Sequence, residues 1–290
     1  MGNKNLLLSL GLFLAIIISF SRFVPSLPQN PRKIKAQETL DAILKKTGDY
    51  CEKVKGMALY FVCQEKVEDE RHIFERKNLL KFSMSTSKNK KPRRIKTKTY
   101  TYDYQLIRKG EEPKEKRILL EQNGKEKYDE NVELRPVRYS GRYMVYGPVG
   151  FLSKRWQPHF EYKIVGEDII DEKRTIIIKS TPKKEMEVNY NFGRVWVDEK
   201  DYSILKIEYD PKSIKEYEDE LSQSPIGDLR KEVIWTTYFG VEKNGVKFPS
   251  QQIIQEFYIN IEGERLLINK ITFKYVDYKF FIVETDVKYK

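Results

Sequence analysis

Apolar residues recur at spacings of three and four in one segment near the start of the chain, residues 38–55. This spacing places them on one side of an α-helix. The residues on that side are Leu40, Ile43, Leu44, Thr47, Cys51 and Val54. Thr39 can cap the start of this helix, and Gly56 can end it in the left-handed conformation. The pattern therefore predicts one amphipathic helix that leads directly into a strand.

After this helix, apolar and polar residues alternate with a period of two over most of the chain, which is typical of β-strands with one buried face. In one clear run the residues that share a face are Tyr100, Tyr102, Tyr104 and Leu106. A shift of one residue would move this whole set to the other face. The pattern therefore predicts that the tyrosine face packs against the core.

Short turn sequences separate several of these strands. Asn123-Gly124 and Asn244-Gly245 favour the type I′ turn, whose twist matches that of a β-hairpin. Glu262-Gly263 predicts a further turn, and Asp277-Tyr278 predicts one between the last two strands. Consecutive strands joined in this way would be antiparallel neighbours in a sheet.

About ten such strands, several of them longer than usual, predict a mainly β (α+β) fold built on a large curved antiparallel meander or open half-barrel. Two interruptions, at residues 147–156 and 213–221, predict short helices. The first of them carries Phe151, Leu152 and Trp156. We expect the short helices to plug the concave side of the sheet, together with the N-terminal helix.

The first 36 residues have the pattern of an export signal. The apolar run Leu6–Phe20 follows a cation at Lys4 and is shorter than the roughly 20 residues that span a bilayer. Ala36 is the best residue for cleavage, and an uncleaved membrane anchor is the alternative. We therefore expect a signal segment at residues 1–36, a single β domain at residues 37–290, and a location in the periplasm or cell envelope.

The formal net charge of the chain is +11 at neutral pH, and the cations concentrate between residues 77 and 117. The densest part is the basic surface formed by Lys88, Lys90, Lys91, Arg93 and Arg94. It predicts either a solvated loop or a contact with an anionic membrane surface, to which each cation would contribute about 1 kcal/mol. Nucleic acid is a poor partner for an exported protein, so we expect no nucleic-acid binding.

Cys51 and Cys63 are the only cysteines of the chain. An even number of cysteines in an oxidising compartment favours a disulfide. Cys51 lies late in the predicted helix and Cys63 in the following strand, so a turn between them could bring their Cα atoms within the ~6 Å that the bond requires. The sequence thus predicts a Cys51–Cys63 disulfide, and two small buried thiols are the alternative.

The sequence contains no catalytic or metal-binding motif. The two histidines, His72 and His159, belong to no metalloprotease pattern, and the cysteines do not have the spacing of metal ligands. There is no nucleophile elbow, phosphate loop or glycine-rich dinucleotide motif. Carboxylates are plentiful, but no pair is distinguished as an acid and a base. We therefore expect no enzyme activity, no cofactor and no metal.

Aromatic residues on the concave side of a curved sheet would suit an apolar ligand. The candidate lining residues are Phe151, Leu152, Trp156, Trp196 and Trp235. Ordinary core packing is the alternative for each of them. The leading hypothesis is a cavity for lipid or lipoprotein acyl chains. The other hypotheses are an envelope scaffold or sensor with a filled core, and a hydrolase with convergent carboxylates.

Two hairpins carry a resemblance to a known family. The segment Gly193–Ile207 contains G-x-V-W-V-D before a strand that ends in K-I-E, and residues 242–249 contain a second recurring hairpin. Together with the order of the predicted elements, they resemble the LolA/LolB-like lipoprotein-localisation family, whose fold is shared with RseB-type envelope sensors. The resemblance implies an open β half-barrel with a hydrophobic cavity closed by helices, and transport or sensing of lipoproteins. The chain is longer and more charged than the carrier members, and no residue matches their gating arginine.

Overall fold

The computed structural model describes residues 39–57, 60–84, 91–109, 112–130, 132, 150, 152–183, 192–214, 226 and 228–281. The predicted export segment lies outside the described residues. Residues 39–290 form one compact unit. Within the described ranges, no helix is both long enough and apolar enough to cross a membrane.

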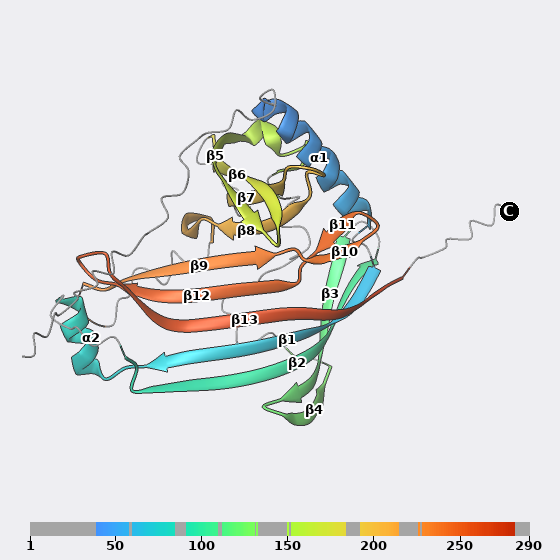
Figure 1. Ribbon diagram of the computed structural model, residues 1–290. Helices are drawn as coiled ribbons and strands as arrows, with labels where there is room; N and C mark the ends of the chain where they lie inside the picture. Colours follow the sequence, from blue (N-terminus) through green and yellow to red (C-terminus); the bar gives the residue numbers. More distant parts are fainter. Residues whose placement is uncertain are drawn as a thin grey trace, which may run out of the picture. The chain divides into compact units, whose positions relative to one another are not determined.

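Eleven of the described strands form one antiparallel sheet, in the order β4-β3-β2-β1-β13-β12-β9-β8-β7-β6-β5 (Figure 1). Their bounds are β1 Tyr60–Ile73, β2 Arg94–Lys109, β3 Glu112–Gln122, β4 Lys125–Asp129, β5 Phe160–Ile170, β6 Lys173–Pro182, β7 Gly193–Asp198, β8 Ile204–Tyr209, β9 Arg230–Tyr238, β12 Gln251–Ile259 and β13 Arg265–Phe280. A separate hairpin pairs β10 (Val241–Lys243) with β11 (Val246–Phe248). The helices are α1 (Leu40–Met57) and α2 (Arg76–Ser83), with the 3-10 helices η3 (Gln157–His159) and η4 (Pro211–Ser213).

The first strand of the chain lies in the middle of the sheet, directly beside the last strand. From β1 the chain runs outward through β2 and β3 to β4, continues at the opposite edge with β5, and returns inward to β13. β4 and β5 do not pair with each other, so the sheet stays open and does not close into a barrel. The predicted mainly β fold, an open antiparallel sheet with few helices, is confirmed.

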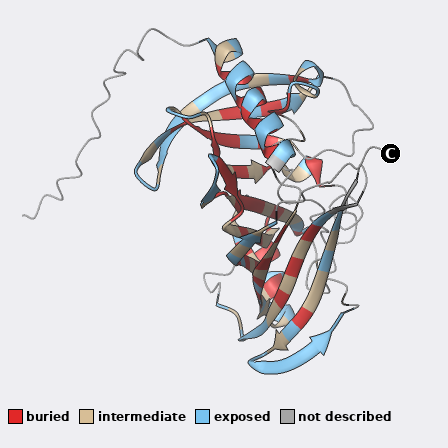
Figure 2. Cartoon of the chain, turned by 90° about the vertical axis from the view of Figure 1, so that its right-hand side faces the viewer, coloured by how far each residue is buried: buried red, intermediate tan, exposed pale blue. Residues whose placement is uncertain are grey.

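One face of the sheet is buried along its centre, and we call it the inner face (Figure 2). On β1 its buried residues are Phe61, Cys63, Glu65, Val67 and Asp69, which are alternate positions of the strand. Directly opposite residues of paired strands face the same side. The partners on β2 include Tyr102, Tyr104 and Leu106, and all three are buried. The predicted packing of the tyrosine face against the core is confirmed.

Helix α1 packs its apolar side into the same core cluster as the inner face. Five of the six residues predicted on the apolar side are buried, namely Ile43, Leu44, Thr47, Cys51 and Val54, and Leu40 is partly buried. The Thr39 hydroxyl accepts a 3.4 Å hydrogen bond from the Ala42 N–H, as a capping residue should. The prediction that Gly56 ends the helix is wrong, because α1 continues through Met57 and Gly56 does not have positive φ. A glycine inside a helix costs little enough for helical hydrogen bonding to continue through it.

Three of the four predicted turns are confirmed by their backbone conformation. Asn123 and Gly124 have φ of 53° and 73°, and Asn244 and Gly245 have 52° and 70°, as type I′ turns require. Gly263, with φ of 82°, lies in the turn between β12 and β13.

The fourth predicted turn, at Asp277-Tyr278, is wrong. β13 runs unbroken through both residues, and the register against β1 shifts where they lie opposite Cys63. Asp277, with φ of 58°, is therefore part of a β-bulge inside one long strand. A bulge and a turn use the same residue types at positive φ, which is why the pattern predicted a turn.

The short helices are only partly within the described residues. Leu152 is helical and precedes η3, and η4 ends just before Ile214, while most of the predicted helix at residues 213–221 lies outside the described part. The sequence pattern does not predict α2. Its residues Leu79 and Phe82 pack with Leu266 and Leu229 in a second, smaller core cluster.

Cys51 and Cys63 are buried thiols in the structure, and no disulfide joins them. Both lie in the main core cluster, and burial raises the pKa of both thiols. Cys63 hydrogen-bonds with the side chain of Tyr278 on β13, because the bulge of β13 faces it. The structure thus corrects the predicted disulfide in favour of the alternative, two buried thiols.

Candidate functional site

Large apolar side chains from five strands lie on the inner face, and we call this set of residues the apolar floor. Its residues are Val67, Phe273, Ile271, Ile254, Val233, Trp235 and Tyr209, from β1, β13, β12, β9 and β8. The register places Ile271, Ile254 and Trp235 side by side on successive strands. Every floor residue is buried, so the floor belongs to the core of the molecule as it stands.

Three of the predicted cavity residues meet in the cluster that contains the floor. Trp235 is part of the floor, and its ring centroid lies 5.1 Å from that of Tyr209. Leu152 is fully buried in the same cluster, and Trp156 packs against it. The indole N–H of Trp235 is buried and has no hydrogen-bond partner among the described residues. Phe151 lies outside the described residues.

Trp196 lies on the other face of the sheet, which we call the outer face. Its neighbours Val195 and Val197 are in the core cluster, so the alternation of the strand directs Trp196 away from it. The Trp196 indole N–H donates a 3.0 Å hydrogen bond to Asp168 Oδ2, and the Lys206 Nζ lies 3.9 Å from the ring centroid. The structure therefore does not bring Trp196 together with the other candidate residues.

A buried charge cluster adjoins the floor on the inner face. Glu65 is fully buried, and Arg117 donates to both of its oxygens, from Nε to Oε2 at 2.6 Å and from Nη2 to Oε1 at 3.1 Å. The Tyr275 hydroxyl donates to Glu65 Oε1 at 3.0 Å. Arg117 Nη1 also donates to Glu115 Oε2 at 3.4 Å, and the Tyr104 hydroxyl donates to Glu115 Oε1 at 2.8 Å. The cluster is thus a connected network across four strands, β1, β2, β3 and β13.

The side chains of this cluster hold one another in place in the fold. Burial raises the pKa of Tyr104 and Tyr275, so both hydroxyls keep their protons and act as donors. Although burial opposes it, the carboxylates of Glu65 and Glu115 raise the pKa of Arg117, which stays charged. Each of these five side chains has a partner. Among the described residues, no three His, Cys, Asp or Glu side chains form a group that could hold a metal ion.

The sequence analysis did not identify this cluster, although the sequence contains a signal for it. Glu65 is a charged residue at an inward position of a strand whose other inward residues include Phe61, Cys63 and Val67. A carboxylate at such a position needs a buried partner. Nothing in the sequence shows that the partner is Arg117, because that contact depends on β3 lying two strands away.

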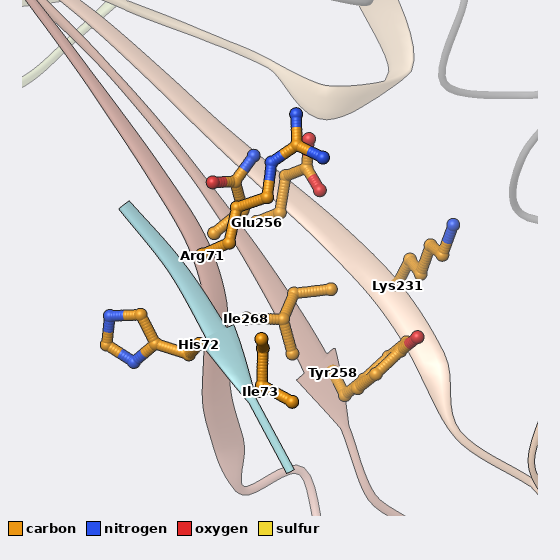
Figure 3. A pocket seen from close by; sticks show the side chains of 8 residues that line it. Arg71, His72, Ile73, Lys231, Glu256, Tyr258 and Ile268 are labelled. Carbon is orange, nitrogen blue, oxygen red and sulfur yellow. The ribbon is translucent and has the colours of Figure 1, made fainter. Parts of the chain in front are cut away.

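A cavity of about 320 Å³ opens on the sheet where β1 leads toward α2 (Figure 3). It is lined by Arg71, His72, Ile73, Lys231, Glu256, Tyr258, Ile268 and Asn269. Arg71 and Glu256 project to the same side of the strands, whereas the imidazole of His72 points to the opposite side (Figure 3). The cavity therefore lies on the inner face, on the side of Arg71.

A β-bulge shapes one wall of this cavity. Glu256 pairs with Asn269, but Phe257 pairs with Leu267, which leaves Ile268 as an extra residue of β13. Such a bulge changes the direction of neighbouring side chains. It places Ile268 and Asn269, an apolar and a polar side chain, in the lining of the same cavity.

Part of the predicted basic surface lies beside this cavity. Lys91, Arg93 and Arg94 are exposed, while Lys88 and Lys90 lie outside the described residues. Arg94 pairs across the strands with Ile73, and the Arg93 N–H donates a 2.8 Å hydrogen bond to the Ile73 carbonyl. Ile73 lines the cavity, so Arg94, its cross-strand partner, lies beside one of the lining residues.

A second cavity, of about 260 Å³, includes Lys173 and Tyr238 in its lining. Lys173 pairs with Asp198, whose Oδ2 lies 3.4 Å from the Lys173 Nζ, and the alternation of β7 places Asp198 on the same side as Trp196. Lys173 therefore lies on the outer face. We take the first cavity as the candidate site because it adjoins the apolar floor.

Comparisons with known proteins give matches of low sequence identity. A family model described only as an uncharacterized protein matches residues 149–218, which is less than half of the chain. No curated protein matches the sequence. The matched segment contains β5 to β8 and the hairpin from which the resemblance was drawn.

Among solved structures, the chain is similar to a DUF1329 family protein from Desulfovibrio piger, with 12% identity, a TM-score of 0.37, and coverage of 86% of this chain and 96% of that one. It is similar to a LolA superfamily protein from Nitrosomonas europaea, with 10% identity, a TM-score of 0.32, and coverage of 88% and 99%. It is also similar to the lipoprotein LppX from Mycobacterium tuberculosis, with 10% identity, a TM-score of 0.28, and coverage of 86% and 100%.

Proposed function

We propose that this chain is an exported, non-enzymatic protein of the cell envelope that shelters lipid or lipoprotein acyl chains on the apolar floor. The observation that supports this function is the floor itself, in which large apolar side chains form a row across β13, β12, β9 and β8. Further apolar residues of β1, β13 and β9 flank this row. Each methylene group that moves from water onto such a surface gains about 0.8 kcal/mol. The export signal expected from the sequence and the LolA/LolB-like hairpins agree with a ligand found in the envelope.

Binding of an acyl chain requires movement of the side chains that cover the floor. Leu152 belongs to the core cluster that contains the floor, and Trp156 packs against that cluster. Both lie on the segment that leads into η3. Gln157 ties this segment to α1, because its Nε2 donates to the Leu44 carbonyl at 2.7 Å and to the Leu152 carbonyl at 2.8 Å. We expect this segment to move away from the floor when an acyl chain enters.

The complete burial of the floor favours a second candidate function. A floor that is always covered would be an ordinary core, and the protein would then be an envelope scaffold or sensor that works through protein–protein contacts. In that case no lipid binds, and a partner protein contacts the outside of the sheet.

Tryptophan fluorescence offers a direct test, because the tryptophans lie on different faces of the sheet. The full chain, purified from its own envelope, is first examined by native mass spectrometry for bound lipid. It is then titrated with a fatty acid that carries bromine atoms, which quench a tryptophan only at contact distance. We expect bound lipid and strong quenching, most of which is lost in Trp235→Phe.

Trp196→Phe is the matched control, because Trp196 lies on the outer face. We expect this variant to keep most of the quenching. Absence of both co-purified lipid and quenching would contradict the proposed function. A single partner found by cross-linking to the lipid-free chain would then establish the second candidate.

A further inference from the structure

The cavity beside Arg71 is the next row of the inner face beyond the apolar floor. Arg71, Asn269 and Glu256 are cross-strand neighbours on β1, β13 and β12. Each stands two residues beyond Asp69, Ile271 and Ile254 of the preceding row, on the same face. Two residues of a strand span about 7 Å, so an acyl chain on the floor would bring its end group into reach of this cavity.

A buried carboxylate holds Arg71 in place at the cavity. Asp69 is 1% exposed, and its Oδ2 accepts from Arg71 Nε at 3.2 Å and lies 3.2 Å from Nη2. The side chain of Arg71 is nevertheless 56% exposed. A guanidinium has five N–H donors, so this contact fixes its orientation and leaves donors for a second anion.

Further cations surround this position on the same face. Lys96 is the cross-strand partner of Arg71, Lys98 is that of Asp69, and Arg94 is that of Ile73. Lys231 lines the cavity from β9. Arg71 and these four cations stand against the two carboxylates of Asp69 and Glu256, so this end of the inner face is positively charged.

The opposite end of the floor differs in its charge. The charge cluster there contains two carboxylates and one arginine, and Glu65 and Arg117 are bound to each other by two hydrogen bonds. An anion would be repelled at that end and attracted at the end of Arg71. An amphiphile on the inner face would therefore lie in one orientation, with its anionic group at the end of Arg71.

We propose that the cavity lined by Arg71, Lys231, Tyr258 and Ile268 is a subsite for the anionic group, phosphate or carboxylate, of the amphiphile whose acyl chain lies on the floor. Arg71 and Lys231 bind the anion, and Ile268 and the ring of Tyr258 contact the first methylene groups. The assignment rests on the proposed function for the position of the acyl chain. It adds the polarity of the ligand and the direction in which it lies.

A pair of probes that differ only in charge tests the subsite. The full chain is titrated with a brominated fatty acid and with the methyl ester of the same acid. We expect the acid to bind at least about tenfold more tightly than the ester, because only the acid makes a charge-assisted contact. In Arg71→Gln the preference for the acid should fall several-fold through weaker binding of the acid, with the affinity for the ester unchanged.

Lys173→Gln is the matched control, because it removes one cation from the outer face. It should keep the preference of the unchanged chain for the acid. Lys231→Gln provides a second variant in case Arg71→Gln does not fold, and it should reduce the preference in the same direction. Circular dichroism of each variant establishes that it is folded before the titration.

The outcomes separate the subsite from the proposed function. If neither probe binds, the proposed function fails. If both bind equally well to the unchanged chain, or if Arg71→Gln keeps the preference for the acid, the acyl site stands and the subsite is wrong. Inorganic phosphate serves as a competitor: if it binds alone as tightly as the acid, the cavity is a site for a free anion and the assignment to an amphiphile is overturned.

Discussion

Glu65 occupies a position that the alternation of β1 assigns to the core, and it is fully buried. Arg117 donates to both of its oxygens, and Tyr275 donates to one of them. A buried ion pair of this kind adds little net stability compared with apolar residues, but removal of one partner leaves the other charge uncompensated. The cluster is therefore a sensitive point of the fold.

Arg117→Met should lower the free energy of unfolding by about 3–5 kcal/mol at neutral pH, because it leaves Glu65 buried without its partner. Urea unfolding at pH 7 measures this loss of stability.

The control for this variant is Arg194→Met. Arg194 pairs with Glu208 at an exposed position, so loss of this pair should change the free energy of unfolding by no more than about 1 kcal/mol. An equal decrease in the free energy of unfolding in Arg117→Met and Arg194→Met would show that the buried pair matters no more to stability than the exposed pair.

At the scale of the element, two glycines illustrate opposite requirements. A Cβ on Gly193 of β7 would lie 2.1 Å from the Glu208 carbonyl oxygen of β8, and backbone cannot give way as a side chain can. A Cβ on Gly56, inside α1, would have no atom within 4 Å. The first glycine is required by close packing of strands, and the second only weakens a helix.

Gly193→Ala should therefore destabilise the protein by about 1–3 kcal/mol or more, through a clash that forces β7 and β8 apart. Gly56→Ala should stabilise it by about 0.5–1 kcal/mol through better helix propensity. Thermal unfolding measures both, with shifts in Tm of opposite sign. A shift in Tm of the same sign in the two variants would refute these different roles of Gly193 and Gly56.

The elements differ in how far the sequence predicts them. α1 and the hairpin turns follow from local patterns, and the inner face of β2 follows from a period of two. α2 has only two buried apolar side chains, Leu79 and Phe82, which is too weak a pattern to predict a helix. The side on which Trp196 lies could not be predicted, because Val195, Trp196 and Val197 form an unbroken buried run with no alternation.

At the scale of the whole molecule, the candidate site depends on strands that are distant in the sequence. Arg71 and Asn269 meet because β1 pairs with β13, and the charge cluster joins β1 to β3 and β13. The sequence alone predicts an open antiparallel sheet, but not which strands pair across its middle. Both the cavity and the cluster are consequences of that pairing, so local patterns could not reveal them.

A chain that ends at residue 264 lacks β13 and leaves β1 and β12 without a shared neighbour. We expect this truncated chain to show no cooperative unfolding transition, because Ile271, Phe273 and Tyr275 are missing from the core. Urea unfolding followed by circular dichroism measures the transition.

A chain that begins at residue 39 is the control, because it keeps the whole compact unit. It should unfold in a single cooperative transition. Retention of such a transition in the chain that ends at residue 264 would show that the sheet does not need its central pair.

The position of β13 beside β1 also sets the order in which the molecule can assemble. β1 is synthesised before the other described strands, but its neighbour β13, residues 265–280, is synthesised after all of them. The middle of the described sheet therefore cannot close until β13 has been made. Under the proposed export, this topology would keep the chain unfolded, and able to pass through a narrow channel, until β13 has followed the other strands.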